Sequence, residues 1–157
     1  MIFETLTYYD NDGGSIAVGN TTYPAQDFDM KVYQSNDAVK KTQYPGRWPT
    51  FSYAEYREIH VAGEILGDSA SDFNTKSRAL RGIITPPMRV FATARRHGEL
   101  RMTFFGDAVT YRAYVIVDSF ETPQEALYPS VGSYAITWIA FEPYLQNIST
   151  GAYVRDL

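Results

Sequence analysis

The sequence predicts a mainly β, α+β fold: an antiparallel β-sandwich or partly closed barrel with long hairpins and one α-helix at about residues 69–84. Segments that alternate bulky and polar residues lie on both sides of the helix in the sequence. The 13 Tyr, 9 Phe and 2 Trp suit strands, where an aromatic ring covers the sheet. The order β-rich, one helix, β-rich is typical of a sandwich or barrel.

In the N-terminal third, the sequence predicts short strands separated by turns and by one long loop. Strands are expected at residues 2–9, 15–18 and 28–34. Asp10-Asn11-Asp12-Gly13-Gly14 predicts a turn, because these residues tolerate positive φ. Residues 35–54 contain Pro45-Gly46 and Pro49, which predict an irregular loop. A loop of this length is expected to be functional or to settle on assembly.

A strand followed by an amphipathic helix is expected in the centre of the chain. Alternation over residues 56–65 places one mostly apolar set toward the core: Arg57, Ile59, Val61, Gly63 and Ile65. Ser69 is a suitable N-cap, with Asp72 three residues later. The apolar stripe of the helix comprises Phe73, Ser77, Leu80 and Ile84, with Lys76, Arg78 and Arg81 facing outward. Pro86-Pro87 ends the helix.

In the C-terminal half, the sequence predicts a series of strands and hairpins. Strands are expected at residues 88–93, 99–105, 110–120 and 133–142. The first two are expected to pair through a tight connection at residues 95–98, and Gly106-Asp107 predicts the next turn. The whole chain is expected to form a single domain, because 157 residues suffice for one hydrophobic core.

Composition excludes several classes of protein. The net charge is −4 and the chain has no basic run beyond Arg95-Arg96, which argues against a sequence-reading nucleic-acid binder. With no Cys, a disulfide scaffold and thiolate metal sites are excluded. The N-terminus lacks the pattern of a signal peptide, and the apolar runs are too short to span a membrane. We therefore expect a protein that is made and first assembled in a cytoplasm, without membrane insertion.

No constellation of residues predicts catalysis, a cofactor or a metal. An EF-hand beginning at Asp10 would need Gly and Glu where Ser15 and Thr21 stand. His60 shares a strand face with Glu58 but has no third ligand at a suitable spacing, and His97 lies in a predicted turn. No acid–base pair can be named, so the sequence predicts a protein that is not an enzyme.

A few residues are candidates for contacts with a partner. Arg95 and Arg96 either contact an anion or simply expose their charges in a hairpin. Trp138 lies in the most apolar strand and is expected in the core. Trp48, in the predicted loop, is either a packed anchor or a contact residue.

Three segments carry a resemblance to a known family. These are Tyr44-Pro45-Gly46-Arg47, the strand at 56–65 with the helix containing Arg78-Ala79-Leu80, and the strand ending Phe141-Glu142-Pro143-Tyr144. Together they resemble the N-terminal domain of phage distal tail proteins, over roughly residues 27–145. The resemblance implies an N-terminal hairpin or arm at residues 1–26, a ring-forming core at 27–145 and a C-terminal tail at 146–157.

The resemblance also implies a function and partners. It implies a structural virion protein at the phage tail tip: a hexameric ring that joins the tail tube to the tail-tip hub. DNA would pass through its lumen without sequence-specific binding. The possible interface or loop contacts are Tyr44, Arg47, Trp48, Arg95 and Arg96. Two alternatives stay open: a tail-tube or tube-terminator subunit with the same architecture, and, in a different class, a carbohydrate-binding β-sandwich that uses exposed Tyr and Trp.

Overall fold

The computed structural model describes residues 3–40, 47–85, 98–122 and 130–154. In this part of the chain the helix is α1 (Ala70–Ile84). The strands are β1 (Phe3–Tyr9), β2 (Ser15–Val18), β3 (Ala25–Lys40), β4 (Arg47–Leu66), β5 (Gly98–Phe104), β6 (Thr110–Glu121), β7 (Val131–Ala140), β8 (Leu145–Asn147) and β9 (Tyr153–Val154). The predicted mainly β fold with a helix in its centre is confirmed.

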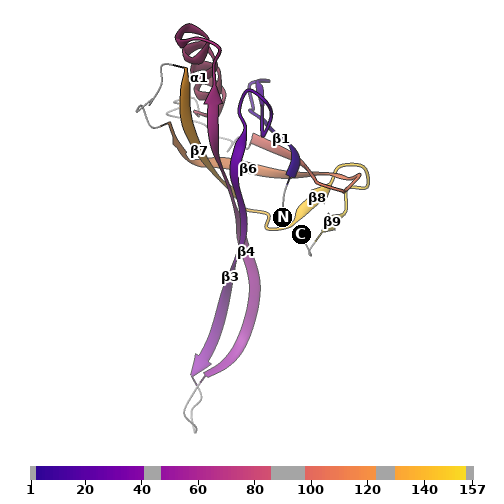
Figure 1. Cartoon of the computed structure of the whole chain (residues 1–157). Coiled ribbons are helices and arrows are strands. Elements are labelled where there is room, and N and C mark those ends of the chain that lie inside the picture. Colours follow the sequence, from indigo (N-terminus) through magenta and orange to yellow (C-terminus); the bar gives the residue numbers. More distant parts are fainter. Residues whose placement is uncertain (1–2, 41–46, 86–97, 123–129, 155–157) are drawn as a thin grey trace.

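The strands form two layers that share β6, and every strand pairing is antiparallel (Figure 1). Sheet A has the order β2-β1-β5-β6-β8-β9, and sheet B has the order β3-β4-β7-β6. Residues 110–115 of β6 pair with β5, whereas residues 116–121 pair with β7. Among the described residues, the path starts at β2 and ends at β3 without joining the two. The predicted sandwich is therefore an antiparallel sheet that folds over itself but is not closed.

The hydrophobic core lies between the inner faces of the two sheets. Its fully buried side chains include Leu6, Leu100, Met102 and Val115 from sheet A, and Ile59, Val61, Ile136 and Trp138 from sheet B. The inward set predicted for β4 is confirmed, because alternate residues from 57 to 65 are all buried. Trp138 is in the core, as predicted.

Helix α1 begins and ends where the sequence predicts. Ser69 is the N-cap, and its Oγ accepts a hydrogen bond of 3.2 Å from the backbone N–H of Asp72. Leu80 and Ile84 are buried, and Phe73 packs against Gly132 of β7, where a Cβ would lie 2.7 Å from the ring. One expectation is wrong: Lys76 does not face outward but is half-buried, because its ammonium group bonds the end of β4.

The predicted loop at residues 35–54 is wrong for residues 35–40 and 47–54, whereas residues 41–46 lie outside the described residues. β3 and β4 continue through this region as a hairpin that extends well beyond the sandwich, at the opposite end of the molecule from α1 (Figure 1). Pro49 does not prevent pairing, because it lies opposite Ala38 at a register shift where the ladder is already irregular. The sequence therefore wrongly predicted a loop around Pro49, because a proline is tolerated where the pairing of an edge hairpin is irregular.

The predicted pairing of residues 88–93 with 99–105 is also wrong. Both sides of β5 are occupied, by β1 on one side and by β6 on the other. The predicted strand at 88–93 itself lies outside the described residues. Sequence proximity favoured a local hairpin, but the N-terminal strand takes that position in the sheet.

The described helix is too short and too polar to cross a membrane.

Candidate interaction surfaces

The described residues include no cluster of three or more His, Cys, Asp and Glu side chains that could hold a metal ion. The predicted turn at Asp10 is confirmed, because its Oδ1 accepts hydrogen bonds from the backbone N–H groups of Asp12 and Gly14. His60 lies on the outer face of sheet B, 3.1 Å from Oγ1 of Thr137.

Within the described residues, sheet B ends in two open edges. β3 spans 16 residues and pairs only with β4, so its other side is unpaired within the described chain. At the opposite end, residues 116–121 of β6 pair with β7, and no described strand pairs with them on the β5 side. The edges of sheet A are different, because β2 has 4 residues and β9 has 2. Long open edges present rows of backbone donors and acceptors that can pair with another chain.

The outer face of sheet B carries an excess of negative charge, which we call the acidic face. It carries one lysine, Lys31, and six carboxylates: Asp27, Asp29, Glu58, Glu64, Asp118 and Glu121. The Nζ of Lys31 lies 3.1 Å from Asp29 Oδ2, and the hydrogen bond from Lys31 lowers the pKa of that carboxyl group. The formal charge of this set is −5, from six carboxylates and one ammonium group.

Tyr56 shows that the negative charge gathers near the base of the hairpin. Its ring stacks on Tyr33 with centroids 4.5 Å apart, and the Tyr33 hydroxyl donates to Glu58 at 3.3 Å. The pKa of Tyr56 is raised by desolvation first, and then by the negative groups around it, which include Glu58 and Asp118. Tyrosine rings and carboxylates thus cover the surface where the hairpin leaves the sandwich.

A buried arginine fixes the base of the hairpin to the C-terminal strands. Arg57 is 1% exposed, and its Nε donates a 2.7 Å hydrogen bond to the backbone carbonyl of Pro143. Its guanidinium group also contacts the Met30 sulfur of β3 at 3.9 Å. Burial lowers the pKa of Arg57. This side chain therefore links β3, β4 and the segment between β7 and β8.

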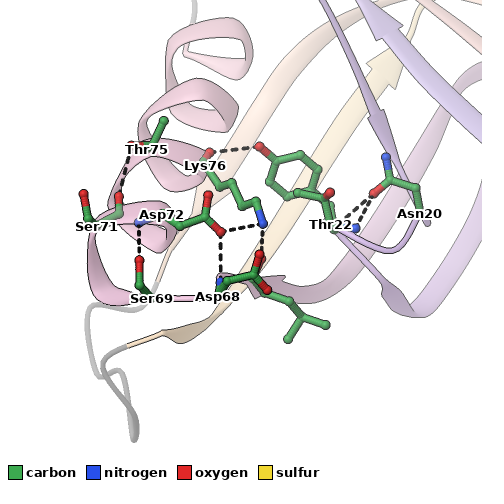
Figure 2. A network of polar contacts seen from close by, with 10 residues as sticks. Asn20, Thr22, Asp68, Ser69, Ser71, Asp72, Thr75 and Lys76 are labelled. Carbon is green, nitrogen blue, oxygen red and sulfur yellow. Dashed lines mark hydrogen bonds and ion pairs between the residues drawn. The ribbon is translucent and has the colours of Figure 1, made fainter.

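At the other end of β4, a polar network holds α1 on the sandwich (Figure 2). Lys76 Nζ donates to the Leu66 carbonyl at 3.0 Å and lies 2.7 Å from Asp72 Oδ2. The same carboxylate oxygen accepts from the backbone N–H of Asp68, and the Tyr23 hydroxyl donates to the Lys76 carbonyl. The network thus fixes the C-terminal end of β4, and Arg57 fixes its middle, so the part of β4 that lies in the sandwich is held in place.

The structure places only part of the predicted contact set. Arg47 and Trp48 lie in β4 at the far end of the hairpin, where their backbones pair with Lys40 and Val39. Tyr44, Arg95 and Arg96 lie outside the described residues. The role of all five in contacts stays a prediction.

Sequence reasoning missed the role of Arg57 and of the outer face of sheet A. A charged residue in an otherwise apolar inward set was the available signal for Arg57. Alternation places Arg112 and Tyr114 on one face of their strand, but nothing in the sequence shows that Arg101 lies directly opposite Arg112. That register depends on strands that the sequence alone does not pair.

Comparisons with known proteins find the fold in phage tail tips. No protein-family model matches the sequence, and no curated protein matches it. The fold is similar to the Dit protein (gp 19.1) of phage SPP1, described as a paradigm of the hub adsorption apparatus in phages that infect Gram-positive bacteria. The TM-score is 0.60 at 12% identity, over 90% of this chain and 52% of that one.

A chain of the phage p2 baseplate, in its activated conformation with Sr, gives a TM-score of 0.62 at 10% identity. The match covers 85% of this chain and 43% of that one. This chain therefore spans about half the length of the solved structures it matches. At these identities the likeness shows the fold, and the resemblance to phage distal tail proteins is confirmed at that level. The chain has the fold of the matched part of these phage tail-tip proteins.

Proposed function

We propose that this chain is a non-catalytic subunit of a phage tail tip, which forms a hexameric ring joining the tail tube to the tail-tip hub. The observation that carries the proposal is the pair of long open edges on sheet B. The similarity of fold to phage SPP1 Dit and to a phage p2 baseplate chain supports the tail-tip location. The proposed location of the protein is accordingly the virion.

The order of strands in sheet B suits a closed ring. The sequence β3-β4-β7-β6 alternates in direction at every step, because each pair is antiparallel. When β3 of one copy lies beside β6 of the next, that junction is antiparallel as well. Such an interface joins two different edges, and a head-to-tail contact of this kind generates a ring when the rotation closes. Closure also removes the unpaired edges.

The position of sheet A decides which face of sheet B lines such a ring. The inner face of sheet B is covered by the core and by sheet A, so sheet A has to lie outside the ring. The acidic face then lines the lumen. Its negative charge repels the phosphates of DNA, which suits a channel through which DNA passes without being retained.

The β3–β4 hairpin is the second feature that supports an assembly role. Its outer half extends past the sandwich in Figure 1 and pairs only with itself in the described chain. In the ring it would reach a neighbouring subunit or the next ring. The residues proposed to make these contacts are Arg47 and Trp48, at the far end of the described hairpin, and Tyr44, which lies outside the described residues. Arg95 and Arg96 are retained as further proposed contacts.

Native mass spectrometry together with negative-stain imaging of the purified chain tests the proposal. We expect hexamers and rings that stop at one or two layers. Long tubes or stacked rings would instead support a tail-tube subunit. A protein that stays monomeric, even when mixed with the tube and hub proteins of the same phage, would overturn the proposal.

A further inference from the structure

A row of outward-facing side chains crosses five strands of sheet A in register. Pairing places Thr7 of β1 beside Arg101 of β5, Arg101 beside Arg112 of β6, Arg112 beside Gln146 of β8, and Gln146 beside Tyr153 of β9. Tyr9, Glu99 and Tyr114 form the next row. The tyrosine–arginine surface is defined as Tyr9, Arg101, Arg112, Tyr114 and Tyr153.

The two arginines of this surface have different partners. The guanidinium carbon of Arg101 lies 4.5 Å from the centroid of the Tyr9 ring, and its Nε bonds the carboxylate of Glu99. Arg112 donates through Nε to the side-chain oxygen of Gln146 at 2.7 Å and lies 5.3 Å from the ring centroid of Tyr114. Among the described residues, no carboxylate forms an ion pair with Arg112.

The register makes this arrangement unfavourable for the isolated chain. Arg101 and Arg112 are directly opposite each other in an antiparallel pair, where like charges destabilise a sheet. Glu99 neutralises one of the two charges. An anion beside Arg112 would neutralise the other and would also use the guanidinium N–H groups that Gln146 leaves free.

We propose that the tyrosine–arginine surface docks a second protein, through a carboxylate that pairs with Arg112 and an apolar contact on Tyr114 and Tyr153. These rings are 46% and 55% exposed. Arginine and tyrosine are the residues that most often dominate the energetics of protein interfaces, where the ring supplies contact area and the guanidinium group binds a carboxylate in two-point geometry.

The identity of the occupant follows from charge and from position. The surface holds one unneutralised arginine beside Glu99, which suits a single carboxylate better than a polyanion such as nucleic acid. A second copy of this chain is disfavoured because the acidic face, its complementary surface, lines the lumen in the proposed ring. Sheet A lies outside that ring, so the docked protein surrounds it. The position of the occupant, unlike the chemistry of the surface, rests on the proposed function.

Binding of defined probes to the purified chain tests the proposal. The probes are a copolymer of glutamate and tyrosine, which presents carboxylates and rings on a polypeptide, and two polyanions, polyphosphate and single-stranded DNA. We expect the copolymer to bind most tightly. Arg112→Glu should weaken its binding at least tenfold, and Tyr114→Ala should weaken it several-fold. Arg78→Glu is the matched control, since Arg78 is exposed on α1, and should leave the Kd unchanged.

Three outcomes would overturn the proposal: no binding of the copolymer, tighter Arg112-dependent binding of a polyanion, or equal losses for Arg112→Glu and Arg78→Glu. Circular dichroism confirms that each variant is folded. Native mass spectrometry of the same samples separates this proposal from the proposed ring. Arg112→Glu should form the same oligomer as the parent protein, whereas a monomeric parent that still binds the copolymer would contradict only the ring and the outside position.

Discussion

The outer faces of the two sheets differ in charge, in edges and in internal pairing. The acidic face of sheet B has six carboxylates and one lysine, and within the described residues it lies between two open edges. The outer face of sheet A carries two arginines and one glutamate among tyrosines, and its terminal strands are short. Open edges suit contacts between copies, and a flat face with exposed rings suits a different partner. The two sides of the sandwich therefore suit different contacts: sheet B suits contacts between copies of the chain, and sheet A suits contacts with another protein.

Removing the outer half of the hairpin should have the largest effect. Replacing residues 35–53 with Asn-Gly would join Gln34 to Ala54 through a two-residue turn that suits an antiparallel pair. The sandwich should still fold, because its core lies elsewhere, but assembly should be lost. Native mass spectrometry reads the oligomer, and a thermal melt checks the fold. Rings that form normally would show that the hairpin plays no part in the contact between copies.

The acidic face can be tested by reversing its charge. Glu58→Lys together with Glu64→Lys changes the formal charge of the chain by +4 on the surface proposed to line the lumen. The assembled double variant should bind double-stranded DNA, with an affinity that falls as salt rises, whereas the parent should not. Gel-shift titration at several salt concentrations measures this. The matched control also changes the formal charge by +4 but on the outer face of sheet A, with Thr5→Lys, Ser15→Lys and Glu99→Lys. Weaker DNA binding is expected there because the charges lie outside the ring.

Arg57 links the base of the β3–β4 hairpin to the segment between β7 and β8, and it should be important for the stability of the fold. Arg57→Ala removes the donor to the Pro143 carbonyl and leaves a cavity, which should cost about 3 kcal/mol of unfolding free energy. Arg57→Met should cost less, because an apolar chain fills the space without a buried charge. Urea unfolding measures both. Arg78→Ala, at an exposed position of α1, should stay within about 0.5 kcal/mol of the parent and serves as the control.

The arginine pair on sheet A should show repulsion in isolation. A double-mutant cycle of Arg101→Gln and Arg112→Gln should give an unfavourable coupling of about 0.2–1 kcal/mol that decreases in high salt. Chemical denaturation at two salt concentrations supplies the four free energies. A favourable coupling would mean that the charges of the two arginines are already neutralised within the chain, so that no external carboxylate is needed.

The smallest effect is expected at the helix that fixes the end of β4. The hydrogen bond from Lys76 lowers the pKa of Asp72 below its ordinary value of 3.8. The folded protein therefore binds this proton less readily than the unfolded chain. The resulting stabilisation is present above the unfolded pKa and is lost as pH falls through the lower folded pKa. Asp72→Asn should lower the Tm near neutral pH, and the difference should shrink as the pH falls below 3.8. A difference that does not change with pH would contradict this assignment.

Local pattern predicted much of the fold, and long-range pairing limited the rest. Alternation in β4 and the cap at Ser69 are local signals, so both were predicted correctly. The hairpin was missed because Pro49 is a strong local breaker, and only the partner strand shows that it lies at an irregularity. The place of β5 next to β1 depends on a contact across about 90 residues, which periodicity does not report.

The candidate surfaces were less predictable for the same reason. The opposition of Arg101 and Arg112, and the gathering of Asp29 and Glu58 on one face, follow from register between strands. The sequence shows that the chain is negatively charged overall, but it does not show how the charged residues are divided between the outer faces of sheets A and B. The prediction of a tail-tip role came instead from the resemblance of a few segments to a phage tail family, and not from the strand pattern.

Disulfide trapping of the proposed junction between β3 and β6 tests whether copies of the chain close into a ring through sheet B. The chain has no cysteine, so Lys31→Cys on β3 combined with Ser119→Cys on β6 would be its only thiols. Both positions lie on the acidic face at opposite edges of sheet B. A small scan that moves each cysteine by two residues would cover the possible registers. We predict that one combination gives a ladder of oligomers ending at the hexamer on a non-reducing gel, and that neither single variant does. No cross-link in any register, or dimers alone, would contradict a ring closed through sheet B.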